Sequence, residues 1–360
     1  MPDDSIIARV EGRTARLSLN RPQAIHALTL EMCRSMTEAL LAWRDDPAID
    51  LVLIDHASGR GFCAGGDVRV AAESGKGDGT AAREFFHTEY RLNALLFSYP
   101  KPVVAMMDGI VMGGGVGVSL PARYRVATER TVLAMPEGAI GLFPDVGAGW
   151  YLPRLLGRTG LWMALTAARL RAADCLLLGL ATDHVRSADI EAVKAEIVAR
   201  PDQIEEILTR YDADAGEPPV GLVRDRIDAL FGRPSLDAIV VALDADGSQW
   251  ALGQLAAIRA HSPQTMQVAF RLFRHGEAMQ GFEEEMALEY AIAARLSASH
   301  DFIEGVRAVL VDKDNAPRWD PAEIEGVDEA RLAAIFAPLP PGEVWTPLPN
   351  PGEKASFRDG

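Results

Sequence analysis

Short apolar segments alternate with helical patterns over roughly the first 190 residues of this 360-residue chain. The segments DLVLIDHA (residues 50–57) and KPVVAMMDG (101–109) have the length and composition of buried strands. Residues 29–46 place apolar side chains at helical spacing after Thr29, which predicts a helix with Thr29 as its N-cap. A second helix is predicted over Thr80–Phe97. Such alternation of strands and helices predicts an α/β core.

The remaining segments predict a helical second half. A hairpin is expected at Ala8–Leu19, and a helical pattern runs from Trp150 to Leu180. Residues 190–260 are acidic and interrupted by proline, residues 262–310 are again helical, and the proline-rich end after Ala337 predicts an extended or loosely ordered tail. We therefore expect three parts, namely a core over residues 1–195 that carries the site, a variable helical connection over 196–260, and a C-terminal helical region and tail over 261–360.

Charge and composition exclude several classes of function. The formal net charge of −15 disfavours a nucleic-acid partner, because phosphate binding needs concentrated Lys and Arg. No uncharged apolar run approaches the ~18 residues that a membrane span needs, so no membrane association is expected. The first residues, MPDDSIIARV, lack the pattern of a signal or transit peptide, and the three cysteines fit no disulfide framework. These observations favour a cytoplasmic protein. The histidines show no metal-ligand spacing, so neither a metal nor a cofactor is expected.

Two glycine-rich segments each follow a predicted strand and precede a helical pattern. GRGFCA (residues 59–64) formally fits a dinucleotide fingerprint, but Gly65, Gly66 and Asp67 interrupt the required strand-to-helix turn. GIVMGGGVG (109–117) lacks the Gly-Lys-Ser/Thr of a P-loop. Either segment alone is typical of tight turns. Together they could bring two backbone N–H groups to one oxygen and form an oxyanion hole.

The stretch AMPEGAIGLFPDVGAGWYLPRL (134–155) is apolar and rich in turns, yet it carries Glu137 and Asp145. On their own, these acids would be interpreted as turn-stabilising side chains. They are not helical neighbours, since Pro144 and several glycines interrupt any helix between them. An acid desolvated among apolar residues has a raised pKa, which suits proton transfer near neutral pH.

Several motifs together resemble the crotonase (enoyl-CoA hydratase/isomerase) superfamily. They are FCAGGD, KPVVAMMDGIVMGGGVG and AMPEGAIGLFPDVGAGWYLPRLLG, with HSPQTMQVAF and HDFIEGVRAVLVDKDNAPRW near the end. The branch most similar to the chain is that of the 3-hydroxyisobutyryl-CoA hydrolases, whose LNRP…NALT opening resembles LSLNRPQAIHALT, with His26 in place of the usual Asn. The likeness extends from about residue 8 to 320 and is poor near 195–255.

This resemblance implies a fold and a set of site residues. The expected fold is an α/β, crotonase-like spiral of repeated ββα units with a helical C-terminal region. The implied ligand is an acyl-CoA thioester, and the implied assembly is a homo-oligomer. By motif, the oxyanion donors are the N–H groups of Gly66 and Gly114, Glu89 binds substrate, and Glu137 and Asp145 are the two active-site acids.

Three reactions of this superfamily compete. Hydration and isomerisation of an unsaturated thioester would use an acid at the position of Gly117, which is absent here. Hydrolysis needs an activated water or a carboxylate nucleophile, and an oxyanion hole. We therefore expect hydrolysis of a short branched 3-hydroxyacyl-CoA, with 3-hydroxyisobutyryl-CoA of valine breakdown as the first candidate. Glu137 would act as nucleophile or general base and Asp145 would assist it. The alternatives are an enoyl-CoA hydratase or isomerase and, more remotely, a non-catalytic scaffold or RNA-binding protein.

A few other side chains are weaker candidates. Lys101 and Lys313 are possible contacts to CoA phosphates, although solvated surface lysine is the plainer interpretation, and Arg69 could pair with Asp67. Cys63 is expected to be a small buried side chain rather than a nucleophile. Phe282, Met286 and Tyr290 share one helical face, which predicts packing on the core, with a subunit interface or a lid over CoA as the alternative.

Overall fold

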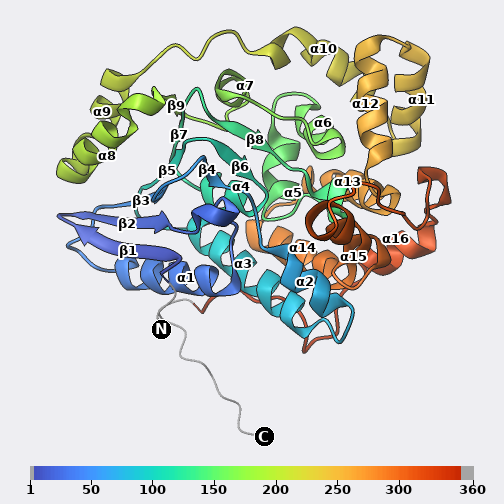
Figure 1. Cartoon of the computed structure of the whole chain (residues 1–360), viewed down its shortest axis with the longest axis horizontal. Coiled ribbons are helices and arrows are strands. Elements are labelled where there is room, and N and C mark those ends of the chain that lie inside the picture. The colour runs from blue at the N-terminus through green and yellow to red at the C-terminus, as the bar shows by residue number, and fades with distance from the viewer. Residues whose placement is uncertain (1–3, 350–360) are drawn as a thin grey trace, which may run out of the picture.

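The computed structural model describes residues 4–349 of the chain (Figure 1). Within these residues the strands form a six-stranded sheet, ordered β1-β2-β3-β5-β7-β9, and a three-stranded sheet, ordered β4-β6-β8. The strands are β1 (Ile6–Glu11), β2 (Thr14–Leu19), β3 (Leu51–His56), β4 (Gly61–Cys63), β5 (Val103–Met107), β6 (Ile110–Met112), β7 (Tyr124–Ala127), β8 (Val132–Ala134) and β9 (Asp183–His184).

The strand order confirms the expected spiral. β1 and β2 form the predicted antiparallel hairpin, and all the other pairings are parallel. Three successive strand pairs, β3–β4, β5–β6 and β7–β8, each contribute one strand to the large sheet and one to the small sheet. A helical segment follows each pair, so the chain winds through repeated ββα turns, as Figure 1 shows.

Helices surround the two sheets and make up the second half of the chain. In the first half they are α1 (Leu30–Arg44), α2 (Val68–Gly75), α3 (Thr80–Phe97), α4 (Gly114–Ser119), α5 (Ala148–Tyr151), α6 (Thr159–Thr166) and α7 (Ala172–Leu177). In the second half they are α8 (Ile190–Ala199), α9 (Ile204–Tyr211), α10 (Pro219–Phe231), α11 (Leu236–Asp246), α12 (Gln249–Ala260), α13 (Pro263–Gly276), α14 (Phe282–Leu296), α15 (His300–Val306) and α16 (Glu329–Phe336).

The long periodic segments form the elements that the sequence predicts. Thr29 caps α1, since its Oγ1 accepts a hydrogen bond from the N–H of Met32 at 3.2 Å. α1 buries the apolar side chains of one face against the sheet, including Cys33, Met36 and Leu40. α3 has the predicted bounds, and its buried face carries Glu89 and Tyr90 toward the interior.

Three predicted segments were wrong in detail. The second glycine-rich segment, expected as a loop, contains the strand β6 and the short helix α4, and the first contains β4. The helical pattern from Trp150 to Leu180 is split into α5, α6, α7 and the 3-10 turn Leu152–Arg154. Strands of three residues are too short to show an alternating pattern, and glycine gives no periodic signal.

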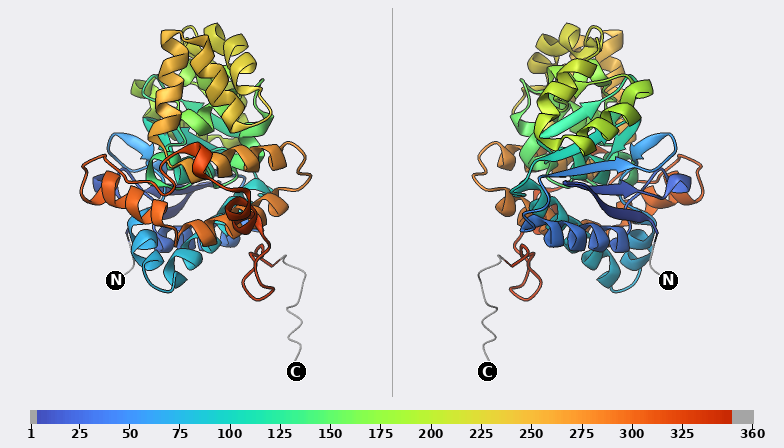
Figure 2. Two further views of the ribbon diagram at one scale, coloured as in Figure 1. Left: turned by 90° about the vertical axis from the view of Figure 1, so that its right-hand side faces the viewer. Right: turned by 90° about the vertical axis from the view of Figure 1, so that its left-hand side faces the viewer.

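The C-terminal half surrounds the core rather than following it as a separate layer. α10 to α12 arch over the top of the molecule in Figure 1, and both views of Figure 2 show this group above the sheets. α13 packs on α5 and α6, and α14 packs along α3. The expected division at residue 195 falls inside α8, and the buried apolar cluster runs from Ala15 to Trp345.

The end of the described chain is extended, as predicted, but it is not loose. Trp345 is 5% exposed, and its Nε1 donates to the backbone oxygen of His87 at 3.3 Å. Arg91, also on α3, donates to both the backbone oxygen and the hydroxyl of Thr346, each at 2.7 Å. The tail is therefore attached to the helix that carries Glu89. The part of the predicted tail beyond residue 349 lies outside the described residues.

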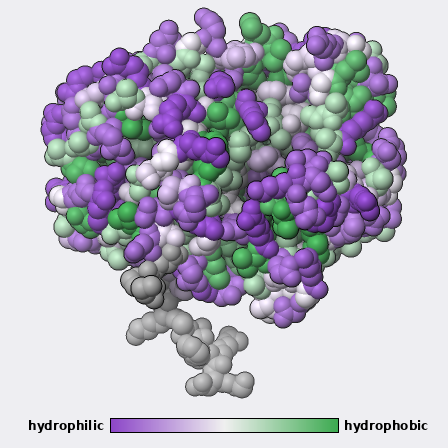
Figure 3. Space-filling view, in the orientation of Figure 1, coloured by the Kyte–Doolittle hydropathy of each residue, from purple (hydrophilic) through white to green (hydrophobic). Residues whose placement is uncertain are grey.

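Polar and apolar side chains alternate over the face of the molecule in Figure 3, without one continuous apolar area. Among residues 4–349, no helix combines the length and the hydrophobicity that crossing a bilayer requires.

Candidate active site

One cavity of about 500 Å³ is lined by all five residues to which the family resemblance assigns a role. Its lining includes Gly66, Glu89, Gly114, Glu137 and Asp145. They come from five separate places in the fold, namely the loop after β4, the middle of α3, the start of α4, the start of the 3-10 turn Glu137–Ile140, and the loop before α5. The spiral therefore brings together residues that are far apart in sequence.

The two glycine loops supply backbone donors at one end of the cavity. The N–H of Leu28 donates to Gly65 and the N–H of Asp67 donates to Leu28, so the N–H of Gly66 between them is left out of this ladder. The N–H of Gly114 opens α4, where a helix has no acceptor for its first amides. A Cβ on Gly114 would lie 3.3 Å from the carbonyl carbon of Gly65, so the two loops are in contact.

Two carboxyl groups face these loops at close range. A Cβ on Gly114 would lie 2.6 Å from Oε1 of Glu89, and a Cβ on Gly113 would lie 2.8 Å from Oε1 of Glu137. Gly113 also has a φ of 48°, which glycine adopts without strain. Glycine is thus required at both positions, because a side chain on either residue would clash with one of these carboxyl groups.

Glu89 and Glu137 are buried without full hydrogen bonding. Glu89 is 2% exposed and Glu137 is 6% exposed, and one carboxyl oxygen of each has no hydrogen-bond partner among the described residues. Burial, followed by the negative charge of Asp145, raises the pKa of both groups well above the usual glutamate value. Buried, unpaired carboxyls cost stability, so their presence here needs a reason other than packing.

Asp145 is held by a partner that the sequence analysis missed. The hydroxyl of Tyr90 donates to Oδ2 of Asp145 at 2.7 Å, from the neighbour of Glu89 on α3. Burial raises the pKa of Asp145 to about 6, and the Tyr90 hydrogen bond acts in the opposite direction by stabilising the carboxylate. The only sequence signal for this role was a tyrosine next to a candidate acid on a predicted helix, and the acceptor of its hydroxyl is 55 residues away.

Arginines rather than lysines line the mouth of the cavity. Arg21 forms an ion pair with Asp67 at 2.6 Å, Arg69 donates to the backbone oxygen of Leu310 at 3.1 Å, and Arg169 is exposed. The expected pairing of Arg69 with Asp67 was therefore wrong, because Arg21 occupies that carboxylate. These arginines give the mouth a local positive charge on an otherwise acidic protein.

Comparison with known proteins gives the family. The family model for enoyl-CoA hydratase/isomerase matches residues 14–336. The chain belongs to the enoyl-CoA hydratase/isomerase family. It is 40% identical over 343 residues to a protein named 3-hydroxyisobutyryl-CoA hydrolase, mitochondrial, from Gallus gallus, covering 93% of this chain and 89% of that one. It is 42% identical over 337 residues to the protein of the same name from Danio rerio, covering 91% and 88%.

Solved structures of two family members have the same fold. The structure of a carnitinyl-CoA dehydratase from Mycobacterium thermoresistibile superposes with a TM-score of 0.90 at 39% identity, covering 94% of this chain and 98% of that chain. The structure of an enoyl-CoA hydratase from Rhodobacter sphaeroides superposes with a TM-score of 0.88 at 37% identity, covering 95% and 99%. The expected crotonase fold with a helical C-terminal region is thus confirmed.

Neither lysine considered as a contact to CoA phosphates lines the cavity. Lys101 donates to the backbone oxygens of Trp43 and Asp46, the second at 2.6 Å, so it ties α1 to the turn before β5. Lys313 is exposed and does not line the cavity. Lys313 therefore fits the interpretation as a solvated surface lysine, whereas Lys101 is half-buried and structural, which neither interpretation predicted.

Cys63 and the helical face of α14 are structural. Cys63 is fully buried, its Sγ donates to the backbone oxygen of His26 at 3.2 Å, and burial raises the pKa of the thiol to about 12. A thiol in this state is a poor nucleophile. Phe282 stacks on Phe97 with ring centroids 4.0 Å apart, so its face of α14 packs against α3. Among the described residues, no group of three or more His, Cys, Asp or Glu side chains could hold a metal ion.

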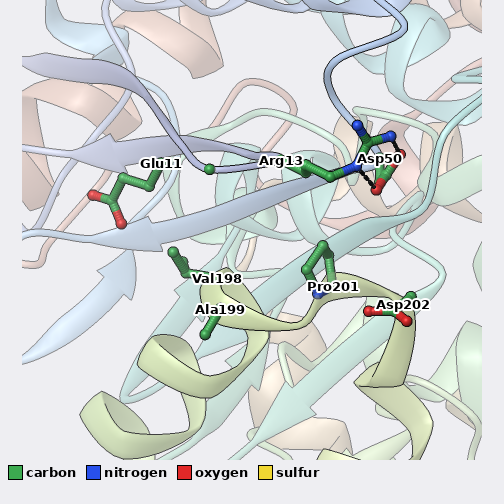
Figure 4. Close-up of a pocket in the computed structure, with 8 residues that line it drawn as sticks. Glu11, Arg13, Asp50, Val198, Ala199, Pro201 and Asp202 are labelled. Carbon is green, nitrogen blue, oxygen red and sulfur yellow. Dashed lines mark hydrogen bonds and ion pairs between the residues drawn. The ribbon is translucent and has the colours of Figure 1, made fainter.

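A larger surface hollow, of about 680 Å³, lies between the β1–β2 turn and the end of α8 (Figure 4). Its charged side chains include Glu11, Asp202 and the exposed Arg13–Asp50 ion pair. Neither the glycine loops nor the buried acids line it. Burial and convergence of polar groups, rather than size, therefore single out the smaller cavity as the active site.

Proposed function

We propose that this protein hydrolyses 3-hydroxyisobutyryl-CoA to 3-hydroxyisobutyrate and CoA. The observation that supports this proposal is the meeting of two buried acids, Glu137 and Asp145, with the backbone donors of Gly66 and Gly114 in one cavity. Relatives about 40% identical over nine-tenths of the chain are named for this activity. The expectation from the sequence and the chemistry of the cavity thus favour the same reaction.

The N–H groups of Gly66 and Gly114 would bind the thioester carbonyl oxygen and stabilise the negative charge that develops on it. Such donors are worth about 3–4 kcal/mol each where water is excluded. Glu137 would then attack the carbonyl carbon, expelling CoA thiolate and leaving a mixed anhydride that water cleaves, or it would take a proton from water that attacks directly. Burial raises the pKa of Glu137 well above the usual glutamate value, which makes its ionised carboxylate a stronger base.

Asp145 and Glu89 would serve the acyl group and the leaving group. Asp145, with a pKa of about 6, can accept a hydrogen bond from the 3-hydroxyl of the substrate or pass a proton to the departing thiolate. Glu89 lies beside both oxyanion glycines, since a Cβ on Gly66 would lie 3.9 Å from its Oε1. Its unsatisfied oxygen is available to a polar group of the substrate.

A hydratase is the second candidate, because the two solved relatives are named for hydration and dehydration. The second acid expected for that reaction would occupy the position of Gly117 on α4. A Cβ there would lie 2.6 Å from Cβ of Val146 and 2.9 Å from Nδ2 of Asn93. A glutamate does not fit at this position without moving the loop that carries Asp145, and this favours hydrolysis over hydration.

The remaining expectations belong to the same proposal. The fully formed cavity argues against a non-catalytic scaffold, and the net charge of −15 argues against RNA. Submicromolar RNA binding in a low-salt filter assay would contradict this. We also propose a homo-oligomer, to be tested by light scattering, and a cytoplasmic location, to be tested by cell fractionation, although the named relatives are mitochondrial.

The test is a substrate panel measured in two ways at once. Thiol release and loss of enoyl absorbance are followed for 3-hydroxyisobutyryl-CoA, 3-hydroxypropionyl-CoA and an unsaturated enoyl-CoA. The proposal predicts thiol release with the highest kcat/KM for 3-hydroxyisobutyryl-CoA. Loss of enoyl absorbance without thiol release would instead identify a hydratase.

A further inference from the structure

A second pair of buried acids lies on α14, behind the active site. Glu285 and Glu289 are four positions apart on one face of the helix, and both are 0% exposed. Two like charges at this spacing destabilise a helix, and burying them costs more. Helix packing does not require them, because apolar side chains would fill the same space at less cost. The sequence analysis gave this pair no role.

The two acids differ in what they contact. Glu289 accepts two backbone hydrogen bonds, from the N–H of Gly147 to Oε2 at 2.8 Å and from the N–H of Gly149 to Oε1 at 3.1 Å. Both oxygens of Glu285 lack a hydrogen-bond partner among the described residues. Burial raises the pKa of Glu285 to about 8, so this side chain is mainly protonated at neutral pH. Only Glu289 hydrogen-bonds the loop, although Glu285 also lies against it, since a Cβ on Gly149 would be 1.8 Å from Oε1 of Glu285.

The loop that Glu289 holds begins at the active-site acid Asp145. Asp145 is followed by Val146 with a φ of 56° and Gly147 with a φ of 92°. A β-branched residue at positive φ is strained by about 1–3 kcal/mol and persists only where its surroundings enforce it. The hydrogen bonds that Glu289 accepts from Gly147 and Gly149 lie directly after Val146 and hold it in this conformation. In the same turn, the N–H of Ala148 donates to the backbone oxygen of Asp145 at 3.0 Å.

α14 also packs along α3, which carries Glu89 and Tyr90. Tyr90 fixes the side chain of Asp145, and Glu289 fixes the backbone that follows it. We infer that Glu289 is a positioning residue of the active site, whose carboxyl group holds the Val146–Gly149 turn so that Asp145 is presented to the substrate. This inference rests on the proposed function for its catalytic readout, but not for its structural one.

The test compares Glu289→Gln with Glu285→Gln. Glutamine keeps the size of the side chain, but its amide nitrogen cannot accept a backbone hydrogen bond, so one contact is lost at position 289 and none at 285. For Glu289→Gln we expect faster hydrogen exchange in residues 143–152 and a fall in kcat of about 10²-fold with little change in KM, as misplacement of a catalytic group produces. For Glu285→Gln we expect neither change.

A double substitution separates positioning from general destabilisation. If Glu289 acts through Asp145, then Glu289→Gln adds no further loss of kcat in an Asp145→Asn background. Independent, multiplying losses would overturn the inference, as would exchange and kcat in Glu289→Gln equal to those of Glu285→Gln.

The wild-type protein provides a check that needs neither a substrate nor a stable variant. The amides of Gly147 and Gly149 should exchange as slowly as those in the middle of α14, and rapid exchange would contradict the inference. Should the wild type release no thiol from 3-hydroxyisobutyryl-CoA, the proposed function fails, while the exchange comparison still decides the role of Glu289.

Discussion

The behaviour of Asp145 depends on two opposing effects that single side chains control. Burial raises the pKa of its carboxyl group to about 6, while the hydroxyl of Tyr90 stabilises the ionised form and so limits this rise. Glu89 and Glu137 line the same cavity, and the charge of Asp145 in turn helps to raise the pKa of both glutamates. These effects keep the pKa of Asp145 at about 6, so near neutral pH its side chain can both accept and donate a proton.

Removing the Tyr90 hydroxyl should therefore move the pH profile. In Tyr90→Phe the carboxylate of Asp145 loses its donor, its pKa rises, and the acid limb of kcat/KM shifts to higher pH. Tyr151→Phe is the matched control, since the hydroxyl of Tyr151 is buried but makes no hydrogen bond within the described chain. An acid limb that stays in place in Tyr90→Phe, or that moves equally in both variants, would contradict this account.

At the scale of single elements, α4 is short, and several side chains lie very close to its backbone. Its first residue, Gly114, lies against Glu89, and Gly117 lies against Val146. Four of the seven residues from Gly113 to Ser119 are glycine, which costs helix stability. Gly113 and Gly114 let Glu137 and Glu89 approach the backbone, while Gly115 and Gly117 leave room for Cys63 and Val146.

Replacing glycine by alanine should thus lower activity on α4 but raise stability on α12. In Gly114→Ala the new Cβ would lie 2.6 Å from Oε1 of Glu89, and kcat should fall by about 10²-fold. In Gly253→Ala, on α12, the Cβ meets nothing within 4 Å, so activity should be unchanged and the free energy of unfolding should rise by about 0.5–1 kcal/mol. Steady-state kinetics and urea unfolding measure both effects. An active Gly114→Ala variant would contradict the close approach of Glu89.

The elements that could be predicted from the sequence are those with long patterns. α1, α3, β3 and β5 have enough residues for their pattern to show, and the five residues to which the resemblance assigns a role line one cavity. β4, β6 and α4 are too short and too rich in glycine for this. Tyr90 and Glu289 could not be predicted, because their partners lie 55 and 142 residues away and only the folded chain brings them together.

At the scale of the whole molecule, charge is distributed unevenly. The chain carries a net charge of −15, yet Arg21, Arg69 and Arg169 line the mouth of the cavity, where a polyanionic CoA would enter. Arg169 forms no ion pair with the residues described here, so its charge is available to a ligand. Salt should weaken acyl-CoA binding if attraction to these arginines dominates. It should strengthen binding if repulsion by the net negative charge dominates.

We expect the local arginines to dominate. KM for the acyl-CoA should rise with ionic strength, and Arg169→Gln should raise KM at low salt while weakening this salt dependence. The matching pantetheine thioester, which lacks the nucleotide phosphates, should show little salt dependence with either protein. A KM that falls as salt is added would mean that the net charge governs substrate capture instead.

The C-terminal helices support the elements that carry the active-site residues. α14 supports both α3 and the Asp145 loop, and the tail near Trp345 is attached to α3 from outside. The buried acids Glu89, Glu137, Glu285 and Glu289 would be costly in a protein selected for stability alone. Glu89 and Glu137 line the 500 Å³ cavity together with Asp145, and this concentration of buried acids is the main reason to assign catalysis there.

The most direct test of the central claim is the rate of thiol release from 3-hydroxyisobutyryl-CoA by Glu137→Gln relative to the wild type. The account predicts a fall in kcat of about 10³-fold. It predicts no loss of stability at neutral pH. The pKa of Glu137 is raised in the folded protein, so the wild type loses stability as pH rises above the unfolded value of 4.5, and glutamine avoids this cost. A folded Glu137→Gln protein that releases thiol at the wild-type rate would contradict the account.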